Sequence, residues 1–403
     1  MNIVLYKRQM CWSRTFKVST LAFILFSHAQ LALAEWTNEI ELEYRYFFNE
    51  PQFPEQNRHA PSIVYKPVWS HVSESGNSVF DFRGYARYDD SDGQRSHVDI
   101  NELTWLYSNN GWEFKSGIGK VFWGVAESQH LVDIVNQTDL VDALDGETKL
   151  GQPMFSIARA TDFGTFDLFI LPYFRERTFP GEQGRLRTQP LVNTDLAVYE
   201  SEDKRSHVDF AFRWSHSFDA YDVGISYFDG TGREPLLSIS EDNRFLIPNY
   251  VQIKQIGIDV QATFDAWLWK LEAIDRSASR QFDAQNFQAV VAGFEYTFFD
   301  VASSGIDVGL VAEYSYDSRG ESTAFNDYSL FAVRLAFNDE QSTDLLAGCN
   351  ADGNLCAIEG SRRLGDSYKL SLRGNLFSGI DDQSIFASQR EDDYVQIGLS
   401  YFF

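Results

Sequence analysis

The sequence lacks the long apolar runs from which membrane-spanning helices are built. Beyond an N-terminal segment, no stretch of the 403 residues approaches the roughly 18 consecutive apolar residues that such a helix needs, although aromatic residues make up 15% of the chain. This absence excludes a helical membrane protein, and the aromatic content needs another explanation.

Basic residues are also scarce. Lysine and arginine together number 34 against 58 aspartates and glutamates, so the formal net charge is −24. A chain this acidic is repelled by phosphate backbones and anionic lipid surfaces. No nucleic-acid partner is therefore expected.

Cysteine occurs only three times, at Cys11, Cys349 and Cys356. The last two flank the segment 350–355, whose Asp-Gly-Asn sequence is typical of a hairpin turn. We predict that they face each other across this hairpin and form a disulfide, with paired free thiols as the alternative. No histidine lies near them, so no metal site is predicted there, and the sequence indicates no cofactor.

The first 34 residues are expected to be a signal peptide. Four basic residues precede an apolar run from Val18 to Phe26, and Ala32-Leu33-Ala34 matches the small-residue pattern of a cleavage site. Met10 is an alternative start to Met1. We expect residues 35–403 to form one domain.

The rest of the chain is dominated by residues that alternate between apolar and polar, the period of a strand with one apolar face. The clearest run is Ile40, Leu42, Tyr44, Tyr46 and Phe48 against Glu39, Glu41, Glu43 and Arg45. The chain ends in the same pattern, because 395–403 places its apolar residues on one parity. The sequence therefore predicts an all-β protein.

The connections between these strands alternate in length. Short turns are expected at 109–111, 161–164, 218–220 and 264–266, and long polar loops at 49–61, 124–153, 175–205 and 229–249. Short turns at one rim and long loops at the other are typical of a transmembrane antiparallel β-barrel with apolar residues toward lipid and polar residues toward the lumen.

The strand count follows from the rule that both chain ends lie on the short-turn rim. Treating 338–366 as one connection would put a long loop on the wrong rim. Dividing it into two strands, 342–349 and 356–363, removes this problem and predicts about 18 strands, or 16 if that pair is not part of the wall.

Two resemblances support this architecture. The chain end, with Gly398, Tyr401 and Phe403, resembles the signal read by the barrel-assembly machinery of Gram-negative bacteria. The resemblance implies a location in their outer membrane, with lipid and lipopolysaccharide as surroundings. Residues 119–124 followed by 136–139 are similar to a porin-like family of uncertain substrate, with alginate-export and phosphate-selective porins as more distant relatives. Analogy with porins implies a homotrimer, but no substrate site carries over.

The third long loop, from Gly124 to Pro153, is the first candidate functional element. Its apolar residues have helical spacing, so one or two short helices are expected. Third loops of many porins fold inward and narrow the lumen, and this one resembles them. An acidic loop facing a basic wall would screen solutes by charge and size. The acidic residues expected at the constriction are Glu127, Asp133, Asp139, Asp142, Asp145 and Glu147.

Arginines supply the second set of candidates. Those on the polar parity of predicted strands would bias the charge of the lumen, or would simply pair with acidic neighbours. Those in the loop 175–205 could bind an anionic solute, grip lipopolysaccharide phosphates or pair with neighbouring loops. The wall set is Arg45, Arg83, Arg87, Arg213 and Arg373, and the loop set is Arg175, Arg177, Arg185 and Arg187.

These observations favour an outer-membrane channel for passive diffusion of small polar or charged solutes. The main alternative is a barrel that exports or takes up one substrate, either an acidic polysaccharide or a lipid-like compound. An outer-membrane hydrolase is the third hypothesis, but none of the histidines lies in a hydrolase motif, so no enzymatic activity is expected.

Overall fold

The structure, a computed structural model, describes residues 35–143, 145–323, 326–380 and 387–403. The predicted signal peptide therefore lies outside the described residues. Among the described residues, no helix is long and apolar enough to cross a membrane.

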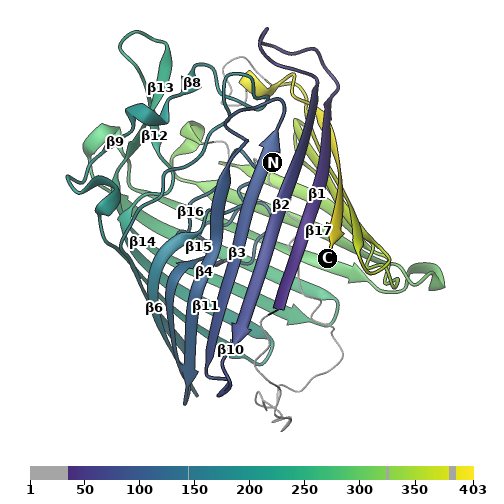
Figure 1. Ribbon diagram of the computed structural model, residues 1–403. Helices are drawn as coiled ribbons and strands as arrows, with labels where there is room; N and C mark the ends of the chain where they lie inside the picture. The colour runs from purple at the N-terminus through teal and green to yellow at the C-terminus, as the bar shows by residue number, and fades with distance from the viewer. Residues whose placement is uncertain (1–34, 144, 324–325, 381–386) are drawn as a thin grey trace.

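In the described part of the chain, eighteen antiparallel strands form one closed barrel (Figure 1). Each wall strand pairs with its neighbours in sequence, and β1 closes the wall by pairing with β22 from Glu39↔Phe402 to Phe47↔Tyr394. The wall strands are β1 Glu35–Phe47, β2 His59–Val72, β3 Ser78–Asp89, β4 Val98–Asn109, β5 Trp112–Gly119, β6 Gln152–Thr161, β7 Gly164–Leu171, β10 Asp209–Phe218, β11 Tyr221–Thr231, β14 Gln252–Phe264, β15 Trp267–Ala278, β16 Phe287–Phe298, β17 Asp307–Asp317, β18 Tyr328–Ala336, β19 Asp344–Asn350, β20 Leu355–Leu364, β21 Tyr368–Phe377 and β22 Tyr394–Phe402.

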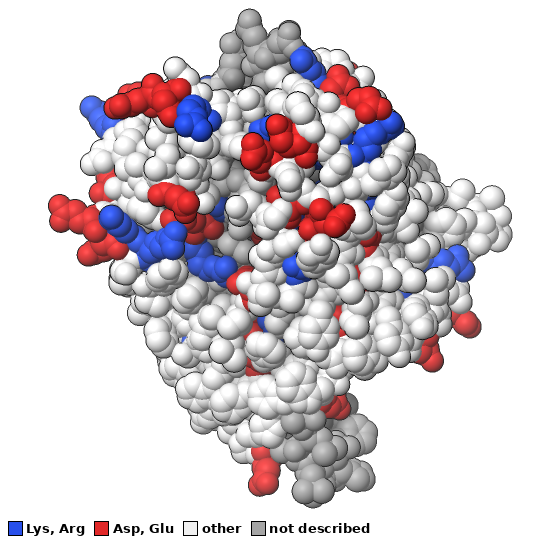
Figure 2. Space-filling view, turned by 45° about the horizontal axis from the view of Figure 1, so that its top comes forward, with Lys and Arg blue, Asp and Glu red and all other residues white. Residues whose placement is uncertain are grey.

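Each strand divides its side chains between the two faces of the wall. In β15, Trp267 and Trp269 point outward and are exposed, whereas Lys270 and Glu272 point inward and are 5% and 0% exposed. The outer wall below the rim is mostly uncharged, and charged side chains gather around the long-loop rim (Figure 2). An apolar belt around a polar interior is the pattern of an outer-membrane β-barrel, so the predicted fold class and location are confirmed.

The two rims differ as predicted. The two-residue turn Asn110-Gly111 joins β4 to β5 with φ values of 48° and 75°, as tight hairpin turns require. Residues 120–151 instead join β5 to β6 at the opposite rim. The chain enters β1 and leaves β22 at the short-turn rim, which is why the strand number is even.

The region 338–366 contains the two strands that were predicted there. Strands β19 and β20 belong to the wall, so the count is 18 and not 16. Cys349 and Cys356 are opposite each other in this hairpin and form a disulfide. The predicted pairing is therefore confirmed.

The closing strand has tight packing on its inward face. A Cβ at Gly398 would lie 2.3 Å from the Ser371 hydroxyl and 2.7 Å from the Glu41 carboxylate. A larger residue at 398 would therefore have to displace the Ser371 and Glu41 side chains from the inward face of β22. Whether Gly398, Tyr401 and Phe403 also form an assembly signal stays a prediction.

The sequence did not predict a second, four-stranded sheet above the long-loop rim (Figure 1). Its strands β8 and β9 have only two residues each, too few to show a period. Strands β12 and β13 pair from Leu236↔Asn249 to Ile239↔Leu246 inside the loop expected at 229–249. The strands are β8 Leu191–Val192, β9 Val198–Tyr199, β12 Leu236–Ile239 and β13 Phe245–Tyr250.

Helical structure in the described residues is limited to short 3-10 turns, all outside the wall strands. They are η1 Thr194–Leu196, η2 Lys204–Ser206, η3 Gln281–Asp283, η4 Val301–Ser303, η5 Gly320–Ser322 and η6 Ala387–Gln389.

Candidate functional site

The connection of residues 120–151, hereafter the lumen loop, is held inside the barrel by inward-facing carboxylates of the wall. Glu272 of β15 accepts hydrogen bonds from the backbone amides of Val125, Ala126 and Val132 at 2.7, 2.9 and 3.2 Å. Hydrogen bonds to an ionised acceptor are stronger than neutral ones. Glu272 therefore takes the place of the carbonyl oxygens that would pair these amides in a helix.

A second wall carboxylate acts in the same way. Glu313 of β17 accepts the backbone amides of Glu127 and Ser128 at 2.8 and 2.7 Å, and the Ser128 hydroxyl at 2.7 Å. Just before this segment, Gly124 has a φ of +119°, and a Cβ there would lie 2.6 Å from a Glu272 carboxylate oxygen. Glycine at 124 allows the backbone to approach the wall this closely.

The prediction of short helices in this loop is wrong. Its described residues, which omit 144, form turns and the isolated bridges Thr138↔Lys149 and Asp139↔Thr178. The apolar residues with helical spacing serve another purpose: Ile134 and Val135 are 3% and 0% exposed and belong to one buried cluster with wall residues such as Phe169 and Phe228. Burial against the wall and the wall carboxylates together outweigh local helix formation.

Ion pairs add to the attachment on this side. The Glu127 carboxylate lies 2.5 Å from the Lys270 ammonium of β15 and 3.2 Å from the Arg334 guanidinium of β18. Burial by itself would raise the pKa of Glu127, but these two cations lower it to about 2. Glu127 is therefore ionised at any physiological pH.

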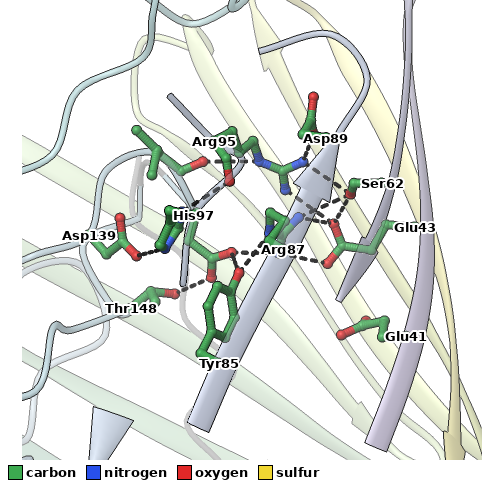
Figure 3. A network of polar contacts seen from close by, with 12 residues as sticks. Glu41, Glu43, Ser62, Tyr85, Arg87, Asp89, Arg95, His97, Asp139 and Thr148 are labelled. Carbon is green, nitrogen blue, oxygen red and sulfur yellow. Dashed lines mark hydrogen bonds and ion pairs between the residues drawn. The ribbon is translucent and has the colours of Figure 1, made fainter. Parts of the chain in front are cut away.

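The lumen loop also reaches the opposite wall (Figure 3). The Tyr85 hydroxyl and the Arg87 guanidinium, both from β3, donate to Asp142 at 2.8 and 2.6 Å. Burial would raise the pKa of Asp142, yet the positive charge of Arg87 above all holds it well below its usual range. Asp145 lies 3.4 Å from Arg373 of β21.

Behind Arg87, the network continues to Glu43 of β1. Glu43 accepts from both terminal nitrogens of Arg87, at 2.5 and 3.1 Å, from Arg95 at 3.1 Å and from the Ser62 hydroxyl at 3.0 Å. All four side chains are buried. This network, hereafter the Glu43 network, ties the wall to the connection between β3 and β4 and, through Arg87, to the lumen loop.

A small cavity adjoins the Glu43 network. Its volume is about 30 Å³, and Arg45, Arg95, Val141 and Arg185 are among the residues that line it. This volume is enough to hold a water molecule.

The acidic residues predicted at the constriction therefore divide into two groups. Glu127, Asp142 and Asp145 face cations or donors of the wall, as described above. The others pair within the lumen loop or with other connections. Asp133 pairs with Lys149 at 3.1 Å, and Glu147 pairs with His130, both inside the loop. Asp139 accepts a hydrogen bond from Thr178 and lies 3.4 Å from His97, which belong to other connections.

The wall arginines also fall into groups with different partners. Arg87 and Arg373 meet the lumen loop. Arg45 donates to Gln396 at 2.8 Å and stacks on the Tyr394 ring, and Arg213 binds Asp259 with two hydrogen bonds of 2.7 and 2.8 Å. Arg83 lies 3.4 Å from Glu102, and its side chain remains 54% exposed.

The four loop arginines do not gather at one point. Arg175 pairs with Asp99 at 2.9 Å, and Arg177 donates to Gln137 at 3.3 Å. Arg185 pairs with Asp392 at 2.5 Å, and Arg187 lies over the Phe53 ring at 3.8 Å. Each arginine therefore stabilises a different part of the long-loop rim.

Several residues of the site were not identified from sequence. Glu272 and Glu313 were expected only as neighbours of basic wall residues, and Arg95 and Asp392 were not singled out. For Glu272 and Glu313, the one local signal is an inward carboxylate within a strand, which does not reveal the backbone amides that reach it from 140 to 186 residues away. Among the described residues, no group of three or more His, Cys, Asp or Glu could hold a metal ion.

The pairing of His130 with Glu147 predicts a pH dependence. Burial would lower the pKa of His130, but the hydrogen bond to Glu147 and nearby carboxylates raise it to about 9. The stabilisation is fully present below the unfolded pKa of roughly 6.5 and is lost as the pH rises through about 9. We expect the melting temperature of the refolded protein to fall over this interval.

The matched variants identify the group responsible. His130→Gln should remove most of that pH-dependent fall, which amounts to up to about 3 kcal/mol for a shift of this size. His59→Gln, at an exposed rim position bonded to Tyr44, should retain it. An unchanged pH profile in His130→Gln would contradict the assignment.

The sequence matches no protein-family model and no curated protein. Solved structures do match. The chain is similar to OccK5 (OpdH) of Pseudomonas aeruginosa, at 10% identity over 92% of this chain and 98% of that chain, with a TM-score of 0.53. It is also similar to Wzi of Escherichia coli, an outer membrane protein involved in group 1 capsule assembly and a carbohydrate-binding β-barrel. That match has 12% identity over 91% and 84% of the two chains and a TM-score of 0.52. At such identities the likeness concerns the fold alone.

Proposed function

We propose that this outer-membrane β-barrel is a channel that passes small polar solutes through a lumen narrowed by residues 120–151. The observation that carries the proposal is the attachment of the lumen loop to both sides of the wall. Glu272 and Glu313 hold it on one side, and Arg87 and Arg373 meet it on the other.

The number and type of these contacts support a fixed constriction. Five backbone amides of the loop donate hydrogen bonds to wall carboxylates. Each charge-assisted hydrogen bond contributes about 1.5–3 kcal/mol to the stability of the attached loop. A loop held in this way would set the pore size and would not open and close freely. Both signs of charge lie beside it, which suits hydrated polar solutes better than apolar ones.

Single-channel recording from the refolded mature protein in a planar bilayer tests the proposal. We expect steady, ohmic conductance steps, with the reversal potential under a salt gradient giving the ion preference. Silence from protein shown to be folded by its heat-modifiable migration on a gel would overturn the channel. Turnover of lipid or peptide substrates by the same sample would instead support the hydrolase hypothesis.

The substrate-specific alternative predicts a different recording. A barrel for an acidic polysaccharide or a lipid-like compound would show conductance that its substrate blocks in a saturable way. We further propose, by analogy with porins, that the barrel is inserted by the barrel-assembly machinery, contacts lipopolysaccharide at its long-loop rim and forms a homotrimer. Cross-linking in native membranes would test the trimer.

A further inference from the structure

The small cavity beside the Glu43 network is lined by two arginines that have unused N–H groups. Arg45, an inward residue of β1, is only 6% exposed, and its Nε donates to Gln396. Its two terminal nitrogens donate to no group in the part of the chain that the structure describes. Arg185, from the connection between β7 and β8, lines the same cavity, and its Nη1 is a buried nitrogen without a hydrogen-bond partner among the described residues.

Two neighbouring aromatic rings hold these guanidinium groups at the cavity. The central carbon of the Arg45 guanidinium lies 4.6 Å from the centre of the Tyr394 ring, and that of Arg185 lies 4.5 Å from the centre of the Phe47 ring. The two ring centres are 5.6 Å apart, because Phe47 and Tyr394 are register partners in the β1–β22 pair. A guanidinium that stacks on a ring keeps the edge that carries its N–H groups available to an anion.

Arg45 is a buried cation without an ion pair. Within the described ranges, no carboxylate lies at ion-pairing distance from its guanidinium. The buried carboxylate two residues earlier in the same strand, Glu43, pairs with Arg87 and Arg95 instead. Burying a charge is costly unless an opposite charge and hydrogen bonds replace the lost water. A negative charge at the N–H edge of Arg45 would therefore stabilise the folded barrel.

The carboxylates of the cavity are bonded to other groups. Those that line it are Asp89, Asp92 and Asp142. Asp89 pairs with Arg95 (Figure 3), and Asp142 pairs with Arg87. Asp92 turns both oxygens toward backbone amides, with the amide of Gly181 at 3.1 and 3.2 Å. In the described structure none of the three binds Arg45 or Arg185, so the unused N–H groups of these two arginines remain open to another acceptor.

We propose that this cavity is a binding site for one small monovalent anion of the size of chloride, held by the N–H groups of Arg45 and Arg185. Its volume of about 30 Å³ suits an occupant no larger than a water molecule or a single ion, and it is too small for a phosphate or an organic acid. The anion would link wall strand β1 to the connection that carries Arg185. It would thereby fasten the long-loop rim to the barrel, whether or not the barrel conducts.

The experiment follows urea unfolding of the detergent-refolded protein while sodium chloride replaces sodium gluconate at constant ionic strength. Gluconate is too large for the cavity, so charge screening stays the same and only the small anion changes. We expect the urea midpoint to rise with chloride in a saturable way. Arg45→Gln should raise the half-maximal chloride concentration by roughly tenfold or more. In gluconate the same variant should lose little stability, because it removes an unpaired buried charge.

A matched control separates this site from general surface charge. Arg205→Gln removes a guanidinium of the long-loop rim whose side chain is 51% exposed and which pairs with Glu176 at 2.6 Å. This variant should respond to chloride as the parent does. A urea midpoint of the parent that is the same in chloride and gluconate, or an Arg45→Gln variant with the chloride response of the parent, would overturn the proposal.

Bromide locates the anion directly, even if Arg45→Gln does not fold. Crystals of the parent protein grown in sodium bromide should show an anomalous peak within hydrogen-bonding distance of Arg45 and Arg185. An ordered water without anomalous signal at this position would refute the anion site and identify the cavity as a hydration site. Neither measurement needs a bilayer, so a conducting barrel without a chloride response would remove only the anion site. A folded barrel that binds chloride but never conducts would remove only the channel.

Discussion

Replacing both Glu272 and Glu313 with alanine is expected to raise the single-channel conductance several-fold. The two carboxylates accept five backbone amides of the lumen loop. Charge-assisted hydrogen bonds contribute about 1.5–3 kcal/mol each, so losing even three of them exceeds about 4 kcal/mol, roughly a thousandfold in the ratio of attached to detached loop. The detached loop would leave the lumen wider and the recorded current noisier.

The single variants and a control make this result specific. Glu272→Ala alone should have a smaller effect, because Glu313 and the Glu127 ion pairs still hold the neighbouring segment. Glu102→Ala changes a carboxylate that pairs with Arg83 on the wall and should leave the conductance near that of the parent. If the double variant conducts like the parent, residues 120–151 do not limit the current.

The largest loss of stability is expected from Glu43→Ala. This buried carboxylate pairs with the buried guanidinium groups of Arg87 and Arg95. Removing one partner of such a pair leaves uncompensated charge in a region of low dielectric and costs roughly 3–5 kcal/mol. The midpoint of urea unfolding, followed by tryptophan fluorescence or by the folded band on a gel, should fall accordingly.

The matched change lies in the loop that follows β1. Glu50 pairs with Arg58 at 2.9 Å, but the Glu50 side chain is 81% exposed, so Glu50→Ala should alter the free energy of unfolding by no more than about 1 kcal/mol. Equal losses from Glu43→Ala and Glu50→Ala would show that the Glu43 network contributes little to stability.

The barrel could be predicted from sequence because its signals are local and repeated. The alternation from Glu39 to Phe48 and the two-residue turns depend on neighbouring residues only. The even strand number followed from rim parity, which identified the 342–349 and 356–363 strands, and the disulfide followed from the turn sequence between the two cysteines. Because this evidence is repeated in many strands, a strand with a poor alternation pattern did not change the prediction of a barrel.

The interior of the lumen loop could not be predicted in the same way. Helical spacing at Leu131, Ile134 and Val135 was a real signal of one buried face, but it does not say what buries that face. The amides that a helix would have used are bonded to Glu272 and Glu313, which lie far along the chain. Local pattern therefore identified Ile134 and Val135 as buried, but it gave the wrong backbone and did not show that every residue from 132 to 139 is buried.

The arginines at the outer mouth illustrate the same limit. Arg177 was singled out from sequence as a member of a basic run with Arg175, Arg185 and Arg187, yet those four have separate partners. Arg177 instead donates to Gln137 of the lumen loop, 40 residues earlier in the chain. Only the closed barrel brings these segments together.

The attachment of the lumen loop also has a consequence for the order in which the molecule is completed. Residues 125 and 127 are separated from their wall carboxylates by 147 and 186 positions along the chain. These contacts can form only when β15 and β17 are in the sheet, and contacts this distant in sequence form slowly. We therefore expect the loop to become attached to this side of the wall late in assembly, because the attachment links the first third of the polypeptide to strands far along the chain.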